Sequence, residues 1–210
     1  MLPVIQYISQ GNSYLDHLES IQECLDGGIR CIQLRVKKGS FEPDYLELIG
    51  EVKKRCREVG ALFIINDHVG LVRAFDVDGV HLGQGDLSYA EARRILGPDK
   101  IIGRTANTKE QLRYELEQGC DYIGLGPYRH THTKTHLAPI LGIGGLLDAM
   151  MDVHRRYPQL PVYAVGGIEL ADLAEIRSAG LAGVAVSGAL FKTKQTRLWV
   201  DTAAKIFRHE

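Results

Sequence analysis

Two aspartates follow neighbouring apolar segments of the chain, where their carboxylates could bind a cation together. Asp67 comes directly after Asn66 at the end of one segment, and Asp86 lies in the short polar stretch after the next segment. Mg²⁺ takes one or two protein carboxylates and completes its octahedral shell with phosphate oxygens and water. The pair therefore predicts a Mg²⁺ site that acts on a phosphate-bearing ligand.

Each aspartate also has a simpler interpretation, which the sequence leaves open. Asp67 precedes an apolar helical segment and could be only its N-cap, and Asp86 could cap the helix that begins near Ser88. Taken as a pair at adjacent strand ends, however, the two positions favour the metal site.

Cationic side chains near these aspartates could bind the phosphate groups of the same ligand, and a diphosphate is the simplest ligand that needs both the metal and the cations. Arg35 and Lys37 alternate with apolar residues at the end of an earlier segment, and Lys134 lies in a later loop. Arg can bind two oxygens at once, and Lys adds a point charge. The alternation could also describe a solvated strand exit, but Gln33 would point to the same side of an otherwise apolar strand. We therefore favour a ligand site.

The loop after the sixth apolar segment is rich in histidine and threonine. It reads Gly126-Pro127-Tyr128-Arg129-His130-Thr131-His132-Thr133-Lys134-Thr135-His136. The three histidines could ligate a metal, but they alternate with threonines and lack a partner Cys or Glu. Hydroxyls and one ammonium are better suited to a lid that closes over a phosphate group.

A second anion site is predicted after the last two apolar segments. These end in Gly166-Gly167 and in Val186-Ser187-Gly188, which let a ligand approach the backbone closely. Loops after strands 7 and 8 of (β/α)8 barrels often hold a phosphomonoester through backbone N–H groups. Either segment alone could be a plain turn, and the two together indicate a phosphate site.

Eight short apolar segments must position all of these residues. They span Val4–Ser9, Cys31–Arg35, Leu62–Asn66, Gly79–Leu82, Ile101–Thr105, Tyr122–Gly126, Val162–Val165 and Gly183–Ser187. Continuous apolar runs are typical of buried parallel strands, and the intervening segments carry helical periodicity. The repeat predicts an α/β protein, a single-domain (β/α)8 TIM barrel over residues 1–210, with its polar strand ends on one face.

Composition narrows the class of partner. A formal net charge of −1 over 210 residues provides no basic field for nucleic acid or an anionic membrane. The N-terminal sequence lacks a basic stretch followed by a long apolar run, so we expect a cytoplasmic protein. The four cysteines have no CxxC spacing, which predicts reduced thiols. A homo-oligomer is compatible with the sequence, which does not fix the oligomeric state.

An ordered set of motifs resembles the thiamin phosphate synthase family over nearly the whole chain. The motifs are Gln33-x-Arg35-x-Lys37, Asn66-Asp67, Gly79-Val80-His81-Leu82-Gly83-Gln84-x-Asp86, Gly124-x-Gly126-Pro127, Thr131-x-Thr133-Lys134, Ala164-x-Gly166-Gly167-Ile168 and Val186-Ser187. No single motif is decisive, but the ordered set, with each motif at the strand end where the family has it, is specific to the family. The resemblance implies the barrel fold, a requirement for Mg²⁺, and the joining of 4-amino-5-hydroxymethyl-2-methylpyrimidine diphosphate to 4-methyl-5-(2-hydroxyethyl)thiazole phosphate. Thiamin phosphate and pyrophosphate would be the products.

The resemblance also implies a role for each matching residue. Asp67 and Asp86 would ligate Mg²⁺. The diphosphate would be held by Arg35, Lys37, Asn66 and Lys134, and the pyrimidine would contact Gln33 and Thr105. The reaction centre would be lined by Thr131 and Thr133. The thiazole phosphate would be bound by the backbone N–H groups of Gly167, Val186 and Ser187. Pyrophosphate would leave as the metal and the cations stabilise its charge, and the thiazole nitrogen would capture the remaining pyrimidine methylene cation. Among these residues, Arg35, Thr105, Thr133 and Lys134 are the predicted catalytic set.

The chain departs from the family pattern in ways that bear on substrate contacts and the lid. Thr105 and Asn107 stand where the family often has Ser and His, and His130 replaces a common Pro. His136 stands where an acidic or amide residue is common. Three other functions stay open: a thiazole tautomerase of the same superfamily, a Schiff-base aldolase using Lys37 or Lys134, and a non-catalytic phosphate-binding barrel.

Overall fold

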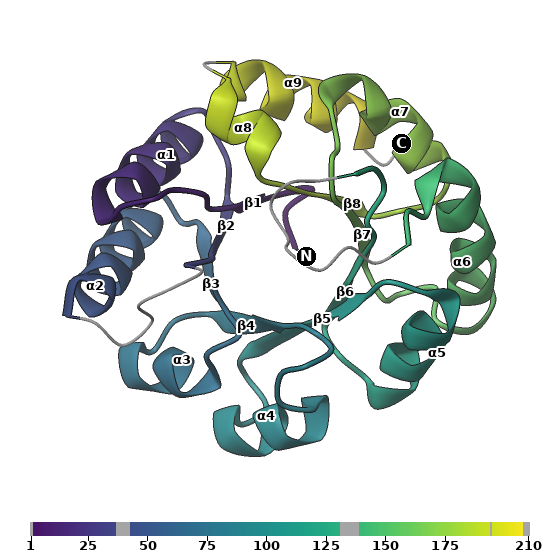
Figure 1. Cartoon of the computed structure of the whole chain (residues 1–210), viewed down its shortest axis with the longest axis horizontal. Helices are drawn as coiled ribbons and strands as arrows, with labels where there is room; N and C mark the ends of the chain where they lie inside the picture. Colours follow the sequence, from purple (N-terminus) through teal and green to yellow (C-terminus); the bar gives the residue numbers. More distant parts are fainter. Residues whose placement is uncertain (1, 37–42, 131–138, 194, 208–210) are drawn as a thin grey trace.

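The computed structural model describes residues 2–36, 43–130, 139–193 and 195–207 of the chain. Eight parallel strands form a closed barrel in which each strand pairs with its neighbour in sequence and β8 pairs with β1. Helices surround the barrel on the outside (Figure 1). The predicted (β/α)8 barrel is confirmed.

The strands lie where the apolar segments predict them, and their ends differ from the prediction by no more than one residue. They are β1 Ile5–Ile8, β2 Cys31–Leu34, β3 Leu62–Asn66, β4 Gly79–Leu82, β5 Ile101–Ala106, β6 Tyr122–Leu125, β7 Val162–Val165 and β8 Gly183–Val186. The apolar run is a reliable guide because both faces of these strands are buried.

The helices follow the strands in sequence. They are α1 Tyr14–Asp26, α2 Pro43–Glu58, α3 Val69–Phe75, α4 Tyr89–Leu96, α5 Lys109–Gln118, α6 Gly142–Arg156, the 3₁₀ turn η1 Leu170–Asp172, α7 Leu173–Ser178, α8 Gly188–Lys192 and α9 Thr196–Phe207. Helix α1 begins with a capping box in which Ser13 is paired to Asp16, and α4 with one in which Ser88 is paired to Glu91. Each box satisfies two backbone N–H groups that the first helical turn would otherwise leave unpaired.

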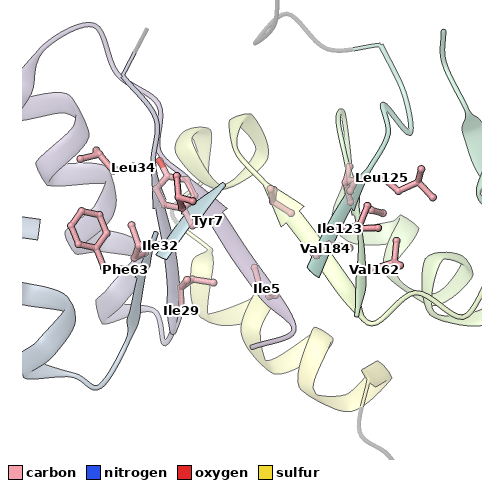
Figure 2. Close-up of a cluster of buried hydrophobic side chains, with 14 of the residues drawn as sticks. Ile5, Tyr7, Ile29, Ile32, Leu34, Phe63, Ile123, Leu125, Val162 and Val184 are labelled. Atoms are coloured by element: carbon pink, nitrogen blue, oxygen red, sulfur yellow. The ribbon is translucent and has the colours of Figure 1, made fainter. Parts of the chain in front are cut away.

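Alternate residues of each strand face the helices and form the main core. Tyr7, Ile32, Leu34, Ile123 and Val184 are all buried in this layer. Figure 2 shows these side chains on the outer surface of the barrel. Burying one such side chain stabilises the fold by roughly 1.5–3 kcal/mol, so the outer layer holds the barrel together and leaves the inner face available for polar residues.

Two tyrosines pack against glycines of neighbouring strands in the interior of the barrel. A Cβ on Gly103 of β5 would lie 2.1 Å from Cζ of Tyr122 on β6. A Cβ on Gly183 of β8 would lie 2.8 Å from Cε1 of Tyr163 on β7. Glycine at both positions therefore makes room for an aromatic ring on the neighbouring strand.

All four cysteines are free, as predicted, and all four are buried. Burial raises the pKa of Cys24, Cys31, Cys56 and Cys120 to about 12. They stay protonated at neutral pH and are poor nucleophiles. In the described part of the chain, no helix is both long enough and apolar enough to cross a membrane.

Candidate active site

A cavity of about 230 Å³ lies at the carboxyl ends of the strands. It is lined by Gln6, Ile8, Gln33, Arg35, Asn66, Asp67, His81, Gly83, Asp86, Thr105, Gly124, Val165 and Ala185. Six of these residues are predicted site residues from four consecutive strands or the loops after them: Gln33, Arg35, Asn66, Asp67, Asp86 and Thr105. The barrel thus brings the predicted carboxylates, amides and guanidinium to one cavity.

Part of the predicted site lies outside the described residues. These residues are Lys37, which follows β2, and Thr131, Thr133, Lys134 and His136 of the predicted lid. Their roles stay predictions.

Asp67 has an unusual backbone conformation at the end of β3. Its φ is 68°, in the left-handed region that non-glycine residues adopt at a cost of about 1–3 kcal/mol. Its backbone N–H donates to the His81 carbonyl at 2.9 Å, which carries the pairing of β3 and β4 one residue beyond Asn66. The N-cap of α3 is His68, so the interpretation of Asp67 as that helix cap is wrong.

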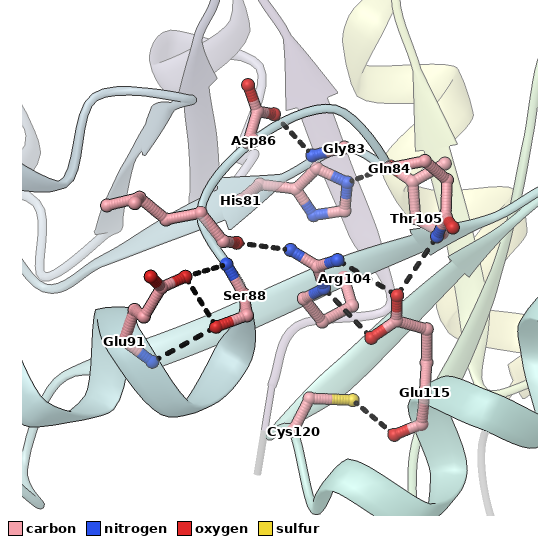
Figure 3. Close-up of polar contacts among 11 residues, drawn as sticks. His81, Gly83, Gln84, Asp86, Ser88, Glu91, Arg104, Thr105, Glu115 and Cys120 are labelled. Atoms are coloured by element: carbon pink, nitrogen blue, oxygen red, sulfur yellow. Dashed lines mark hydrogen bonds and ion pairs between the residues drawn. The ribbon is translucent and has the colours of Figure 1, made fainter.

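Asp86 is held by the loop between β4 and α4. Its Oδ2 accepts a hydrogen bond from the Gly83 N–H at 2.6 Å (Figure 3). The N-cap of α4 is Ser88, whose capping box with Glu91 is complete without Asp86. Helix capping therefore accounts for neither aspartate, although both line the cavity.

A chain of hydrogen bonds crosses the base of the cavity. The Gln33 amide donates to Oε1 of Gln6 at 3.1 Å, and the Gln6 amide donates to the Tyr122 hydroxyl at 3.1 Å. The same hydroxyl lies 2.9 Å from Nδ1 of His81, and Nε2 of His81 lies 2.8 Å from Oγ1 of Thr105. Five strands thus contribute one side chain each, and the two predicted pyrimidine-binding residues stand at the ends of the chain.

This network controls which polar atoms face the cavity. Burial raises the pKa of Tyr122 well above its usual value, so the hydroxyl keeps its proton. Its oxygen accepts from Gln6, so its proton is available to Nδ1 of His81. In the tautomer that accepts this proton at Nδ1, the imidazole carries its own proton on Nε2 and donates to Thr105.

Sequence reasoning assigned no role to Gln6, His81 or Tyr122. His81 lies within a recognised motif, and Gln6 is a polar residue between Ile5 and Tyr7 in an apolar strand. That alternation indicates an inward polar side chain, by the argument already applied to Gln33. Tyr122 carries no such signal, because tyrosine is common in strands of any kind.

The glycines after β7 adopt conformations that favour glycine. Gly166 has a φ of 97° and Gly167 a φ of 64°. A Cβ on Gly167 would also lie 2.8 Å from the His130 carbonyl oxygen, so the chain after β6 packs directly against this turn. Close packing therefore explains the glycine pair without a ligand. The predicted phosphate site stays a prediction.

The residues predicted to hold this phosphate follow the cavity wall. Val165 of β7 and Ala185 of β8 line the cavity. Gly167 comes two residues after Val165, and Val186 and Ser187 come directly after Ala185. The Ser187 hydroxyl donates to Oε1 of Gln10 at 3.3 Å. Arg129 donates to the Gly167 carbonyl at 2.8 Å and forms a bidentate pair with Asp172.

Three of the four departures from the family pattern, Thr105, Asn107 and His130, lie in the described part of the chain. The Asn107 side chain donates to the Gly126 carbonyl, which joins the end of β5 to the start of the loop after β6. His130 is exposed at the end of that loop's described part. Asn107 therefore has a structural contact in place of the titratable group that the family often has.

A closed barrel with convergent polar strand ends defines a (β/α)8 enzyme, and comparison with known proteins gives its family. A family model described as thiamine monophosphate synthase matches residues 5–190. The thiamine-phosphate synthase of Flavobacterium johnsoniae is 43% identical over 197 residues, which are 94% of this chain and 92% of that protein. The enzyme of the same name from Phocaeicola vulgatus is 40% identical over 190 residues, 90% of this chain and 91% of that protein.

Solved structures agree with these sequence matches. A thiamine phosphate pyrophosphorylase from Pyrococcus furiosus has a TM-score of 0.82 and 29% identity, covering 97% of this chain and 95% of that one. A 3-hexulose-6-phosphate synthase, at 14% identity and a TM-score of 0.70, shares the fold alone. The chain belongs to the thiamine monophosphate synthase family and is a transferase.

The hydrogen-bond chain through Tyr122 can be tested without a ligand. Tyr122→Phe leaves Gln6 and His81 without their shared partner, so we expect the free energy of unfolding to fall by about 1–3 kcal/mol. The ring ¹⁵N shifts of His81, measured by NMR, should change from one tautomer to a mixture.

Tyr163→Phe is the matched control. Its hydroxyl donates only to the Pro3 carbonyl at 3.0 Å among the contacts described for it, outside the hydrogen-bond chain. This variant should leave the His81 shifts unchanged. An unaltered His81 spectrum in Tyr122→Phe would contradict the assigned network.

Proposed function

We propose that the chain is a thiamin phosphate synthase that joins 4-amino-5-hydroxymethyl-2-methylpyrimidine diphosphate to 4-methyl-5-(2-hydroxyethyl)thiazole phosphate. Family membership supports the reaction class. The observation that carries the proposal is the cavity that collects Arg35, Asn66, Asp67 and Asp86 beside a polar base ending in Gln33 and Thr105. A diphosphate on a polar heterocycle requires both features.

Mg²⁺ fits the donor set of this cavity. Asp67 and Asp86 would hold the ion, and within the described residues no group of three or more His, Cys, Asp or Glu side chains could form a complete protein cage. Two carboxylates with the remaining ligands from diphosphate and water are the usual arrangement for Mg²⁺. When bound, the ion would neutralise charge on the diphosphate and stabilise it as a leaving group.

The protein's own residues would orient the pyrimidine diphosphate. Arg35 and Asn66 would bind diphosphate oxygens, with Lys37 and Lys134 adding positive charge. Gln33 and Thr105 would contact the pyrimidine, each fixed by its place in the hydrogen-bond chain. Thr131 and Thr133 would line the reaction centre, as the resemblance implies.

The reaction would be a dissociative substitution. The bond between the pyrimidine methylene carbon and the diphosphate oxygen breaks, and the electron pair leaves with pyrophosphate. The thiazole nitrogen then donates its lone pair to the methylene cation and forms the new C–N bond. The electron-rich aminopyrimidine stabilises the cation, so the protein needs no nucleophile. The buried, protonated cysteines are consistent with that mechanism.

The thiazole phosphate would bind on the opposite side of the cavity, at the backbone N–H groups of Gly167, Val186 and Ser187. Because β7 and β8 lie across the barrel from β3 and β4, the two anions would not repel each other at close range. A cytoplasmic location stays a prediction, in agreement with the four free thiols.

The two aspartates on the cavity argue against a thiazole tautomerase, which has no diphosphate to bind. A Schiff-base aldolase would need a lysine, and Lys37 and Lys134 both lie outside the described residues.

The decisive experiment incubates the protein with both substrates and Mg²⁺ and follows thiamin phosphate and pyrophosphate. We expect stoichiometric formation of both products and no activity in excess EDTA. Absence of product with folded protein and both substrates would refute the proposal.

The metal assignment predicts that Asp67→Asn separates activity from stability. Asn adopts the left-handed conformation about as well as Asp, so Tm should change little, whereas Ala at this φ would add strain. Turnover should fall by about 100-fold or more because the variant loses a metal ligand. Asp76 has a left-handed φ of 48° far from the cavity and provides the control Asp76→Asn, which should keep full activity.

The thiazole phosphate site predicts an effect of charge at Ser187. Ser187→Asp would place a carboxylate beside the phosphate and should weaken thiazole phosphate binding by about tenfold or more in calorimetry. Ser187→Asn introduces a neutral side chain of about the same size as Asp, so this variant should bind the thiazole phosphate nearly normally. Gly167 is unsuitable for this test because any side chain there is strained and meets the His130 carbonyl. Equal affinities of the two Ser187 variants would move the site elsewhere.

Lys134 distinguishes the synthase from the aldolase. If its ammonium stabilises departing pyrophosphate, Lys134→Ala should lower kcat by about 10²–10³ with little change in thiazole phosphate affinity. Lys134→Arg should restore part of the rate, because the cation is retained. An aldolase would give no rescue by Arg, and borohydride with a carbonyl substrate would trap an adduct on Lys134, detectable by intact mass.

A further inference from the structure

A buried ion pair lies directly behind the loop that carries Asp86. The Arg104 guanidinium donates to both carboxylate oxygens of Glu115, from Nε at 2.9 Å and from Nη2 at 2.9 Å. The Arg104 side chain is only 5% exposed and that of Glu115 only 1%. Figure 3 shows the two side chains pointing toward one another from β5 and α5. Arg104 lies between Gly103, which faces the Tyr122 ring, and Thr105, which lines the cavity, so its side chain is on the outer face of β5.

The remaining hydrogen bonds of the pair go to the Asp86 loop. Nη1 of Arg104 donates to the Leu87 carbonyl at 2.9 Å. The Gln84 amide donates to Oε1 of Glu115 at 3.0 Å and also to the Thr105 carbonyl. The loop is therefore fixed two residues before Asp86 and one residue after it, and both contacts lead to the same ion pair.

Stability alone is a poor explanation for this arrangement. Removing two charges from water costs several kcal/mol, and an apolar pair of similar volume often stabilises a protein as well or better. An apolar pair at Arg104 and Glu115 would still pack α5 against β5. It would not bind the Leu87 carbonyl or the Gln84 amide, and these contacts are directional.

We infer that Arg104 and Glu115 are positioning residues that hold Asp86 in place for the metal, acting through Leu87 and Gln84. This inference rests on the proposed function, in which Asp86 binds Mg²⁺. The clamp, formed by Arg104, Glu115 and Gln84, also contacts the Thr105 carbonyl through the Gln84 amide. It therefore reaches both the loop that bears Asp86 and the backbone of Thr105, which lines the cavity. Outer contacts of this kind typically change metal affinity by about 10–100-fold.

The test replaces the pair with apolar side chains and measures metal binding directly. The double variant Arg104→Met/Glu115→Met removes both charges together, so neither is left buried alone. We expect Tm near that of the parent protein. Binding of Mn²⁺ in the presence of inorganic pyrophosphate, measured by EPR, should weaken by about tenfold or more. Thiazole phosphate affinity should stay within about twofold, because that site lies on other strands.

Gln84→Met is a second, milder variant that keeps the ion pair. Gln84 is exposed, so this variant should fold even if the double variant does not. Losing its hydrogen bonds should weaken Mn²⁺ binding by about threefold to tenfold. The matched control is Arg113→Met/Asp152→Met, which removes a partly exposed ion pair between α5 and α6 and should leave Mn²⁺ binding unchanged.

Asp86→Asn separates failure of this inference from failure of the proposed function. If the parent and Asp86→Asn bind Mn²⁺ equally, Asp86 is not a metal ligand and the metal assignment itself is wrong. If Asp86→Asn weakens binding but Gln84→Met and the double variant both bind as the parent does, the clamp has no positioning role. A fall in Tm with unchanged Mn²⁺ affinity would likewise assign the pair to stability alone and overturn the inference.

Discussion

Tyr122 lies inside the barrel against Gly103, and the cavity depends on this contact. The ring fills the space that a side chain on Gly103 would need. Tyr163 packs edge-on against it, with ring centroids 5.7 Å apart. An eight-stranded barrel has room for little more than its own side chains, and this ring occupies interior space next to Gln6 and His81, which line the cavity. Its hydroxyl sets the polarity of the cavity base through Gln6 and His81.

Strand β5 connects this interior to the outer clamp. Gly103 and Thr105 face inward, whereas Arg104 between them faces outward to Glu115. The alternation of a strand thus gives three consecutive residues three separate functions: space for Tyr122, support for the Asp86 loop, and a hydroxyl at the cavity. A shift of register by one residue would exchange these faces and disrupt the base of the cavity and the clamp together.

The sequence was sufficient for the barrel and for the strand ends, because apolar runs and their polar termini are local patterns. It could not decide whether Asp67 caps α3, since that depends on which residue begins the helix. The Arg104–Glu115 pair and the Tyr122 contacts were also out of reach. Tyr122 and Gln6 are 116 positions apart, and their hydrogen bond follows from the closure of the barrel. The glycine pair after β7 shows the opposite difficulty, because close packing and phosphate binding predict the same residues.

The proposed division of the barrel into two anion sites would explain why so few protein groups need to titrate in the proposed reaction. The leaving diphosphate would lie at β2 to β4 and the incoming phosphate at β7 and β8, with the pyrimidine held between them by the hydrogen-bond chain. As the bond breaks, negative charge would collect on a pyrophosphate that cationic groups already hold, and the attacking nitrogen would belong to the substrate. The protein's contribution is to fix positions before the bond breaks, which is why buried, fully paired polar contacts are built into the strands rather than left to the loops.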